Sequence, residues 1–173
     1  MKNNHMTITL VKSALTVALI FVFFTIFRGF ANLLNAFLVP MALYMGLKEA
    51  DRAQAFTLFA AVMIFALLFF SVQVFFILLY FAMALMLRQM MVKDVSTVKT
   101  GLLLSLVAAV GIYAGIRLTD LVFLTPLHRV YMAMLGGSWL YYGLFLLAEG
   151  LMAGFGLAVV AKAVARRMAK VHP

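Results

Sequence analysis

The sequence contains no cysteine, and this absence excludes disulfides, zinc–thiolate sites and thiol catalysis. Acidic side chains are also scarce, with five Asp and Glu against 14 Lys and Arg. Charged residues make up 11% of the 173 residues, whereas a soluble domain carries about a quarter. Because apolar residues account for 67% of the chain, we predict an integral membrane protein with almost no soluble part.

The net charge of +9 would indicate nucleic-acid binding in a soluble protein. In a membrane protein, however, basic residues that flank apolar runs are signals of topology. The chain has no Gly-rich phosphate loop and no basic helix long enough to follow a duplex. We therefore expect membrane lipid and other membrane subunits as partners, and no nucleic acid.

Sequence motifs for catalysis are missing as well. There is no His-Glu-x-x-His or Gly-x-Ser-x-Gly sequence, and the three histidines lie near the ends or in loops. Asp120 and Glu149 are a weak basis for an intramembrane hydrolase, because nothing in the sequence holds them together. We therefore predict no catalytic residue, no metal site and no cofactor. A channel or a self-sufficient transporter is also disfavoured, since neither a filter-like segment nor an inverted repeat is visible.

Long apolar runs predict an all-α membrane protein with six transmembrane helices, forming a single domain over residues 1–173. The run 55–88 decides the number of spans. As one helix it would be about 51 Å long, well beyond the ~30 Å hydrocarbon core, so we place a turn at residues 71–73. A loop with a short amphipathic piece covers 124–138. The predicted spans are 8–27, 33–47, 55–70, 74–88, 101–123 and 139–165.

The distribution of basic residues orients these spans. With six spans, both termini share one side with the loops 48–54 and 88–100, and that side holds 11 of the 14 Lys and Arg. Without the turn the division becomes six against eight. Because basic residues favour the cytoplasmic side, we predict six spans with both termini cytoplasmic, in a bacterial inner membrane. The three basic residues left on the outer side are Arg28, Arg117 and Arg129.

The last span, 139–165, begins with a belt of aromatic residues at 139–142, as expected at a membrane–water interface. Glu149 lies about 11 residues from the start of the span, hence ~16 Å deep. A carboxylate at that depth should be protonated, paired or facing a polar cavity. Its candidate partners are Arg117 or Arg28 reaching inward.

Small residues recur one turn apart in the same span, at Gly150, Gly154 and Ala158. Small side chains let a second helix approach closely, which is how helices associate in lipid. We therefore predict that this stripe is a packing surface for a partner helix. Ala14 and Ala18 repeat the spacing in the first span.

Polar side chains gather in the outer half of the predicted spans. Arginine pairs well with carboxylate or phosphate, so this gathering favours a small polar or anionic ligand that enters from outside. Two simpler interpretations stay open: Arg117 and Asp120 pair with each other, or the charged residues only face water and headgroups. The predicted ligand-binding residues are Arg28, Asn32, Asn35, Arg117, Asp120 and Glu149.

Six short spans in 173 residues, cytoplasmic termini and the Ala14-x-x-x-Ala18 pattern resemble the substrate-binding S-components of energy-coupling factor transporters. The resemblance implies that Ala14 and Ala18 contact a transmembrane coupling subunit, and that ATPase subunits complete the complex. It also implies an outward-facing site for a vitamin or metal, lined by the outer-half residues.

The segment 38–61 (LVPMALYMGLKEADRAQAFTLFAA), with the hairpin and basic loop after it, is also similar to rod-shape-determining MreD proteins and YybS-type membrane proteins. This similarity implies a scaffold subunit of a cell-shape complex, in which Gly150, Gly154 and Ala158 dock a partner helix and Glu149 fixes its register. Our first hypothesis is the substrate-binding subunit of a multi-subunit uptake transporter for a small polar or anionic nutrient. The scaffold subunit is the alternative, and neither is an enzyme.

Overall fold

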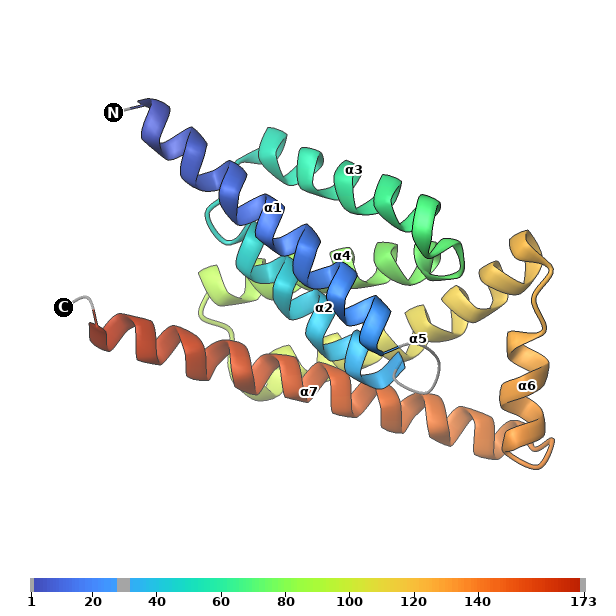
Figure 1. Cartoon of the computed structure of the whole chain (residues 1–173). Coiled ribbons are helices and arrows are strands. Elements are labelled where there is room, and N and C mark those ends of the chain that lie inside the picture. Colours follow the sequence, from blue (N-terminus) through green and yellow to red (C-terminus); the bar gives the residue numbers. More distant parts are fainter. Residues whose placement is uncertain (1, 28–31, 172–173) are drawn as a thin grey trace. The chain divides into compact units, whose positions relative to one another are not determined.

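Every regular element that the structure describes is a helix, as the composition predicts. The computed structural model describes residues 2–27 and 32–171 (Figure 1). Within these ranges, four segments are long and apolar enough to cross a membrane, and α1 and α2 contain two shorter apolar segments. The chain is therefore an all-α, multi-pass membrane protein. The helices are α1 (Lys2–Ile26), α2 (Asn32–Leu47), α3 (Arg52–Phe69), the 3-10 turn η1 (Ser71–Gln73), α4 (Val74–Val92), α5 (Thr97–Phe123), α6 (Leu127–Met134) and α7 (Trp139–Val171).

The helices divide into two compact units, which are described one at a time. Unit 1 is Met1–Arg88 and contains α1 to α3 and most of α4, and unit 2 is Gln89–Pro173 and contains α5 to α7. Each predicted span overlaps one helix, with ends that differ by up to six residues, as at the start of α1 and the end of α7. The single membrane domain over residues 1–173 stays a prediction.

In unit 1, α1 and α2 form an antiparallel pair. Near one end of the pair, Lys12 forms an ion pair with Glu49, which follows α2 directly. At the other end, Asn35 Nδ2 donates a hydrogen bond of 3.2 Å to the backbone oxygen of Phe27. Pro40 lies inside α2, which runs unbroken from Asn32 to Leu47. Contacts at both ends thus hold the two helices along their length.

A turn separates α3 from α4 at the position predicted from length and charge. The backbone of Phe70 leaves the helical region, and one 3-10 turn follows at Ser71–Gln73. The rings of Phe59 on α3 and Phe81 on α4 lie 4.9 Å apart, so α4 runs back along α3. The predicted break in the long apolar run is therefore confirmed, although no Gly or Pro marks it.

Phenylalanine rings hold α1 against α3. The ring of Phe21 lies 5.1 Å from Phe65 and 5.6 Å from Phe70, and the ring of Phe24 lies 5.5 Å from Phe70. The crevice that these rings line has a volume of about 10 Å³, which is roughly the room for one water molecule. Sites for small ligands typically hold ~300–1,000 Å³. This apolar crevice is therefore too small for a nutrient.

In unit 2, α5 and α7 pack along each other in opposite directions (Figure 1). A Cβ atom on Gly150 would lie 2.6 Å from the Ser105 backbone oxygen, and one on Gly154 would lie 2.6 Å from the Ser105 Cα. A Cβ atom on Gly101 would meet the ring of Phe155 at 2.6 Å. Only residues without a side chain allow the two backbones to come so close.

The small-residue stripe of α7 therefore has its partner inside the chain. Gly150 and Gly154 face α5, and Ala158, one turn further along the stripe, is fully buried. We predicted these residues as a packing surface for a partner helix. The close approach is present, and the helix that occupies the stripe is α5 rather than a helix of another subunit.

Two helix starts carry local caps. The side chain of Asp51 accepts a hydrogen bond of 2.8 Å from the Gln54 N–H, and Gln54 Oε1 accepts one of 3.0 Å from the Asp51 N–H, a capping box that begins α3. Ser96 Oγ accepts from the Lys99 N–H at the start of α5. The residue before α6 is Pro126, whose side chain accepts no hydrogen bond, so the cap of α6 has to come from elsewhere.

Candidate ligand site

Asp120 caps α6 from a distance along the chain. Its carboxylate accepts hydrogen bonds from the N–H groups of Leu127 (2.7 Å) and His128 (2.8 Å), and from the hydroxyl of Thr125 (2.9 Å). The first N–H groups of a helix have no partner within the helix, and a negative charge near them is favourable. Asp120 thus ties the start of α6 to the last turn of α5.

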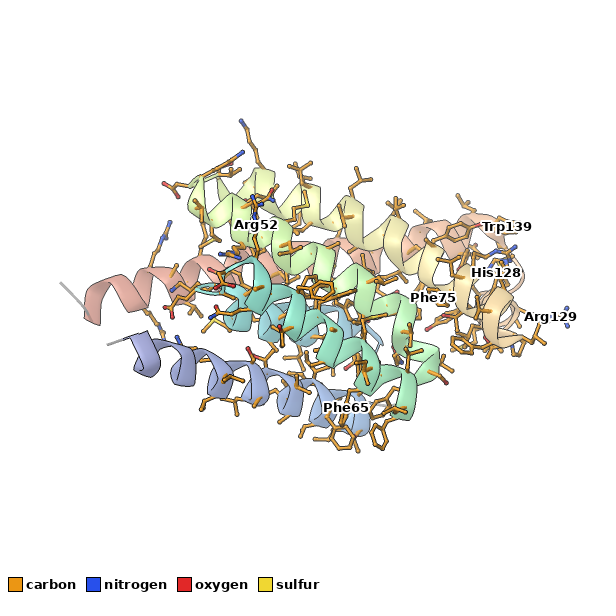
Figure 2. The ribbon with its side chains drawn as sticks, turned by 90° about the horizontal axis from the view of Figure 1, so that it is seen from above. Arg52, Phe65, Phe75, His128, Arg129 and Trp139 are labelled. Carbon is orange, nitrogen blue, oxygen red and sulfur yellow. The ribbon has the colours of Figure 1, made fainter. Side chains whose placement is uncertain are left out.

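Aromatic rings from α5, α6 and α7 meet beside this cap. The His128 ring lies 5.1 Å from the Trp139 ring and 5.1 Å from the Tyr142 ring. The Tyr113 ring on α5 lies 6.3 Å from the Tyr142 ring. Figure 2 shows His128 and Trp139 together at this end of unit 2, with Arg129 pointing away from them. We call the antiparallel pair of α5 and α7 the hairpin, and the residues at this end of it the hairpin-end cluster: Tyr113, Arg117, Asp120, His128, Trp139 and Tyr142.

Two buried polar atoms in the cluster lack a hydrogen-bond partner. Among the residues that the structure describes, nothing bonds to the Tyr142 hydroxyl or to His128 Nδ1. The Tyr142 side chain is only 1% exposed, whereas its neighbour Tyr141 is 60% exposed. A buried polar atom left without a partner costs about 1–3 kcal/mol. Such an atom therefore calls for an explanation, and a bound polar molecule is one.

Arg117 supplies the cluster with a positive charge. Its side chain lies on the exposed face of α5, near the end of the helix and one turn after Tyr113, whose ring approaches Tyr142. No ion pair joins Arg117 to Asp120 within residues 2–27 and 32–171, so the simple pairing left open above is absent there. Both oxygens of the Asp120 carboxylate serve the start of α6 instead. The Asp120 carboxylate is thus occupied, and the Arg117 guanidinium leaves a positive charge available to a ligand at this end of unit 2.

Glu149 lies deeper in unit 2 and away from Arg117. It is 7% exposed, and it directly precedes Gly150, which faces Ser105 and Ala109 on α5. Arg117 is about eight residues further along α5 than Ala109, hence ~12 Å away along the axis. That separation is beyond the reach of one side chain. Within the described ranges no ion pair reaches Glu149, and the predicted pairing with Arg117 is not formed.

The other three predicted ligand-binding residues belong to unit 1. Arg28 lies outside the described residues. Asn32 begins α2, and its side chain also lies outside the described part. Asn35 is fully buried, and its Nδ2 bonds to Phe27, while no described residue donates to its Oδ1. The predicted set is therefore divided, and only Arg117 and Asp120 are placed in one cluster.

Ala14 and Ala18, the predicted contact with a coupling subunit, lie on an exposed face of α1. Thr16, Ile20 and Phe24 occupy the buried face of the same helix. The exposed face also carries Leu10, Val11, Leu15, Leu19, Val22 and Ile26. It is therefore open to lipid or to another helix.

Sequence reasoning missed His128 and Tyr142 as site residues. We placed Tyr142 in the aromatic belt at 139–142 and His128 in the loop 124–138, and included neither among the predicted ligand-binding residues. The spacing of Trp139 and Tyr142, three residues apart, does predict that both lie on one face of a helix. No local pattern indicates that His128 comes to that face, because the cap that orients α6 is seven residues from its start.

Comparison with known protein families, curated proteins and solved structures gave no match. Among residues 10–27 and 34–167, whose side chains the structure describes, no group of three or more His, Asp or Glu side chains is placed to hold a metal ion. The hairpin-end cluster is therefore considered for what its own atoms can bind. Hydroxyl, imidazole and guanidinium groups together suit a carboxylate or a phosphate.

Proposed function

We propose that this protein is the substrate-binding subunit of a multi-subunit uptake transporter in a bacterial cytoplasmic membrane. It binds a small anionic molecule at the hairpin-end cluster and makes no covalent bond itself. In this proposal α1 to α5 and α7 cross the membrane, and both termini are cytoplasmic. The observation that carries the proposal is the pair of buried, unpartnered polar atoms, Tyr142 Oη and His128 Nδ1, at the end of the α5–α7 pair that also carries Arg117.

The charges of unit 2 support an outward-facing site. The end of the hairpin opposite the cluster carries Lys93, Lys99, Lys162, Arg166 and Arg167. Lys162 Nζ lies 3.4 Å from the Asp94 carboxylate at that end. Because basic residues favour the cytoplasmic side, the cluster then lies on the opposite side, where a nutrient arrives. The exposed Trp139 and Tyr141 beside the cluster suit a membrane–water interface.

The packing of α7 weighs against the scaffold alternative. That hypothesis needs the stripe of Gly150, Gly154 and Ala158 for a partner helix, and α5 occupies it. The exposed face with Ala14 and Ala18 remains open, and small residues there suit the close approach of a coupling subunit. Unit 2 therefore supplies the ligand site in our proposal, and α1 supplies the contact with other subunits.

The proposal is tested by ligand-dependent stabilisation of the detergent-purified chain. A molecule that binds only the folded state at 100 times its Kd stabilises it by about 2.7 kcal/mol, which raises the melting temperature. We would screen small carboxylates, phosphate esters and vitamins, and repeat any positive result with Tyr142→Phe. The shift should be lost in Tyr142→Phe and kept in Tyr141→Phe, the exposed tyrosine one residue away.

Two further measurements separate the hypotheses. Co-purification of ATPase and coupling subunits with the wild-type chain, but not with an Ala14→Leu, Ala18→Leu variant, supports the transporter subunit. Cell-wall-synthesis partners in their place support the scaffold.

Reporter tags on the two tails should both report the cytoplasm, and tags in opposite compartments would contradict the six-span topology.

A further inference from the structure

We propose that α6 is a hinged lid over Tyr142, and that Asp120 is the positioning residue that latches it shut. The inference rests on the proposed function for the identity of what the lid admits. The geometry of the lid itself is independent of any ligand. Four observations carry it: what α6 covers, how it is attached, what flanks it and how little of it is buried.

The lid rests on the ring of Tyr142, whose hydroxyl is unpartnered. His128, the second residue of α6, places its ring 5.1 Å from Tyr142 at an angle of 78°, so the two rings meet edge to face. Tyr131, one turn later, lies 6.0 Å from Phe145 on α7. One face of α6 therefore rests on the first two turns of α7. A polar molecule that reaches Tyr142 has to displace this face or pass its edge.

Hydrogen bonds attach the start of α6 to the end of α5. Three hydrogen bonds of 2.7–2.9 Å connect Asp120 to Thr125, Leu127 and His128. None of the residues 127–134, all of which the structure describes, is buried. A packed helix is held by buried side chains, and α6 has none, so the Asp120 carboxylate is a main attachment of its first turn. Loss of the carboxylate should thus free it without unfolding α5 and α7.

Positive backbone angles flank α6 on both sides. Leu124, which ends α5, has φ +52°, and Gly136 and Gly137 after α6 have φ +68° and +72°. A Cβ atom on either glycine would meet nothing within 4 Å, so packing does not demand glycine there, and the backbone conformation does. A non-glycine residue in this region is strained, and strain of this kind is common at switches. These two points are the hinges of the lid.

The absence of cysteine makes opening directly measurable, because one introduced thiol is the only thiol in the chain. We would place it at the covered position, Tyr142→Cys, and measure its reaction with a negatively charged methanethiosulfonate reagent in detergent micelles. Adding Asp120→Ala should accelerate labelling roughly tenfold, because loss of a charged cap and its hydrogen bonds shifts opening by about that factor. Asp120→Asn, which keeps one acceptor oxygen, should give a smaller increase.

A second thiol position controls for general loosening. Tyr141→Cys is exposed, so its labelling rate should be unchanged by either Asp120 variant. Equal acceleration at both positions, or no acceleration at Tyr142→Cys, overturns the lid. The experiment uses no ligand, so its failure leaves the proposed function standing. If labelling changes as expected but the ligand screen is negative, the proposed function is rejected and the lid stands.

Hydrogen exchange of the unmodified chain covers the case in which the Asp120 variants fail to fold. If α6 opens as a lid, the amides of 127–134 exchange together, at least tenfold faster than those in the middle of α5 and α7. Exchange of α6 at the same rate as the adjoining turns of α7 would show that it opens only with the hairpin. That result contradicts a separate lid.

Discussion

The two units use opposite kinds of side chain to pack helices. In unit 1, α1 meets α3 through large rings, with Phe21, Phe24, Phe65 and Phe70 spaced at 5.1–5.6 Å. In unit 2, α5 meets α7 through residues with almost no side chain, so that Ser105 contacts the stripe of α7 at backbone distance. Lipid tails are as apolar as phenylalanine, so burial drives neither contact strongly. Both helix contacts therefore depend on how closely the side chains pack, and they should differ in how well they tolerate a change of side-chain size.

Large flexible contacts and small rigid ones should respond differently to substitution. A ring that is removed leaves a space that neighbouring rings and lipid can partly fill. A side chain that is added between two backbones has nowhere to go, because the helices themselves must separate. Unit 2 should therefore be the more sensitive of the two, and the following substitutions test that difference.

The largest effect is expected for Gly154→Leu. A Cβ atom alone would lie 2.6 Å from the Ser105 Cα, so the leucine must push α5 and α7 apart. We expect a loss of at least about 3 kcal/mol of stability, measured by unfolding in mixed micelles. Gly143→Leu on the same helix is the matched control, since a Cβ atom there meets nothing within 4 Å. Equal losses in both variants would refute tight α5–α7 packing as the cause.

A smaller loss is expected for Phe70→Ala in unit 1. Phe70 is 9% exposed and touches two rings of α1. We expect a loss of about 2 kcal/mol of stability. This is less than the same substitution costs in the core of a soluble protein, because moving the ring from lipid into the protein gains little free energy. Phe56→Ala, at a position on α3 that is 70% exposed, should change stability by less than about 0.5 kcal/mol. A loss for Phe70→Ala larger than that of Gly154→Leu would reverse the comparison.

Tyr142→Phe should stabilise the ligand-free chain. The substitution removes a buried hydroxyl that no described residue bonds, while the ring keeps its contacts with His128 and Tyr113. We expect a gain of about 1 kcal/mol, or roughly 3 °C in melting temperature for a chain of this size. Tyr141→Phe should change neither quantity. A loss of stability in Tyr142→Phe would mean that the hydroxyl already has a structural partner.

The smallest effect is expected at the ion pair between Lys12 and Glu49. Both side chains are about half exposed, at 46% and 59%, so water screens their attraction. A double-mutant cycle with Lys12→Met and Glu49→Gln should give a coupling free energy below about 0.5 kcal/mol. A coupling above ~1 kcal/mol would show that the pair, and not helix packing, fixes the position of α1 against α2.

Much of the helical arrangement was predictable from the sequence, because it depends on length and local composition. The run 55–88 is too long for one span, and the structure breaks it at Ser71–Gln73. The short amphipathic piece in the loop 124–138 is α6. The stripe at Gly150, Gly154 and Ala158 correctly indicated close helix packing. Its partner was missed because spacing along one helix does not say which helix faces it.

The candidate site was predictable only in part. Arg117 and Asp120 were expected at the outer end of the fifth span, and they do lie in the hairpin-end cluster. Their roles differ from the expectation, because the Asp120 carboxylate binds backbone N–H groups of α6. Tyr142 resembles any interfacial tyrosine in the sequence, and only its packing among the rings of Tyr113, His128 and Trp139 distinguishes it as a buried tyrosine with an unpartnered hydroxyl.

The sequence by itself determined that the chain is a helical membrane protein, where the long apolar run breaks, and that the Gly150–Gly154 surface approaches another helix closely. These properties follow from hydropathy, run length and side-chain size, all of which are local. The tertiary structure alone decided that α5 occupies the small-residue stripe, that Asp120 caps α6 and that the His128 ring of α6 packs against Tyr142. Each of these depends on the register between helices that are far apart in the chain, and a single-helix pattern carries no information about that register.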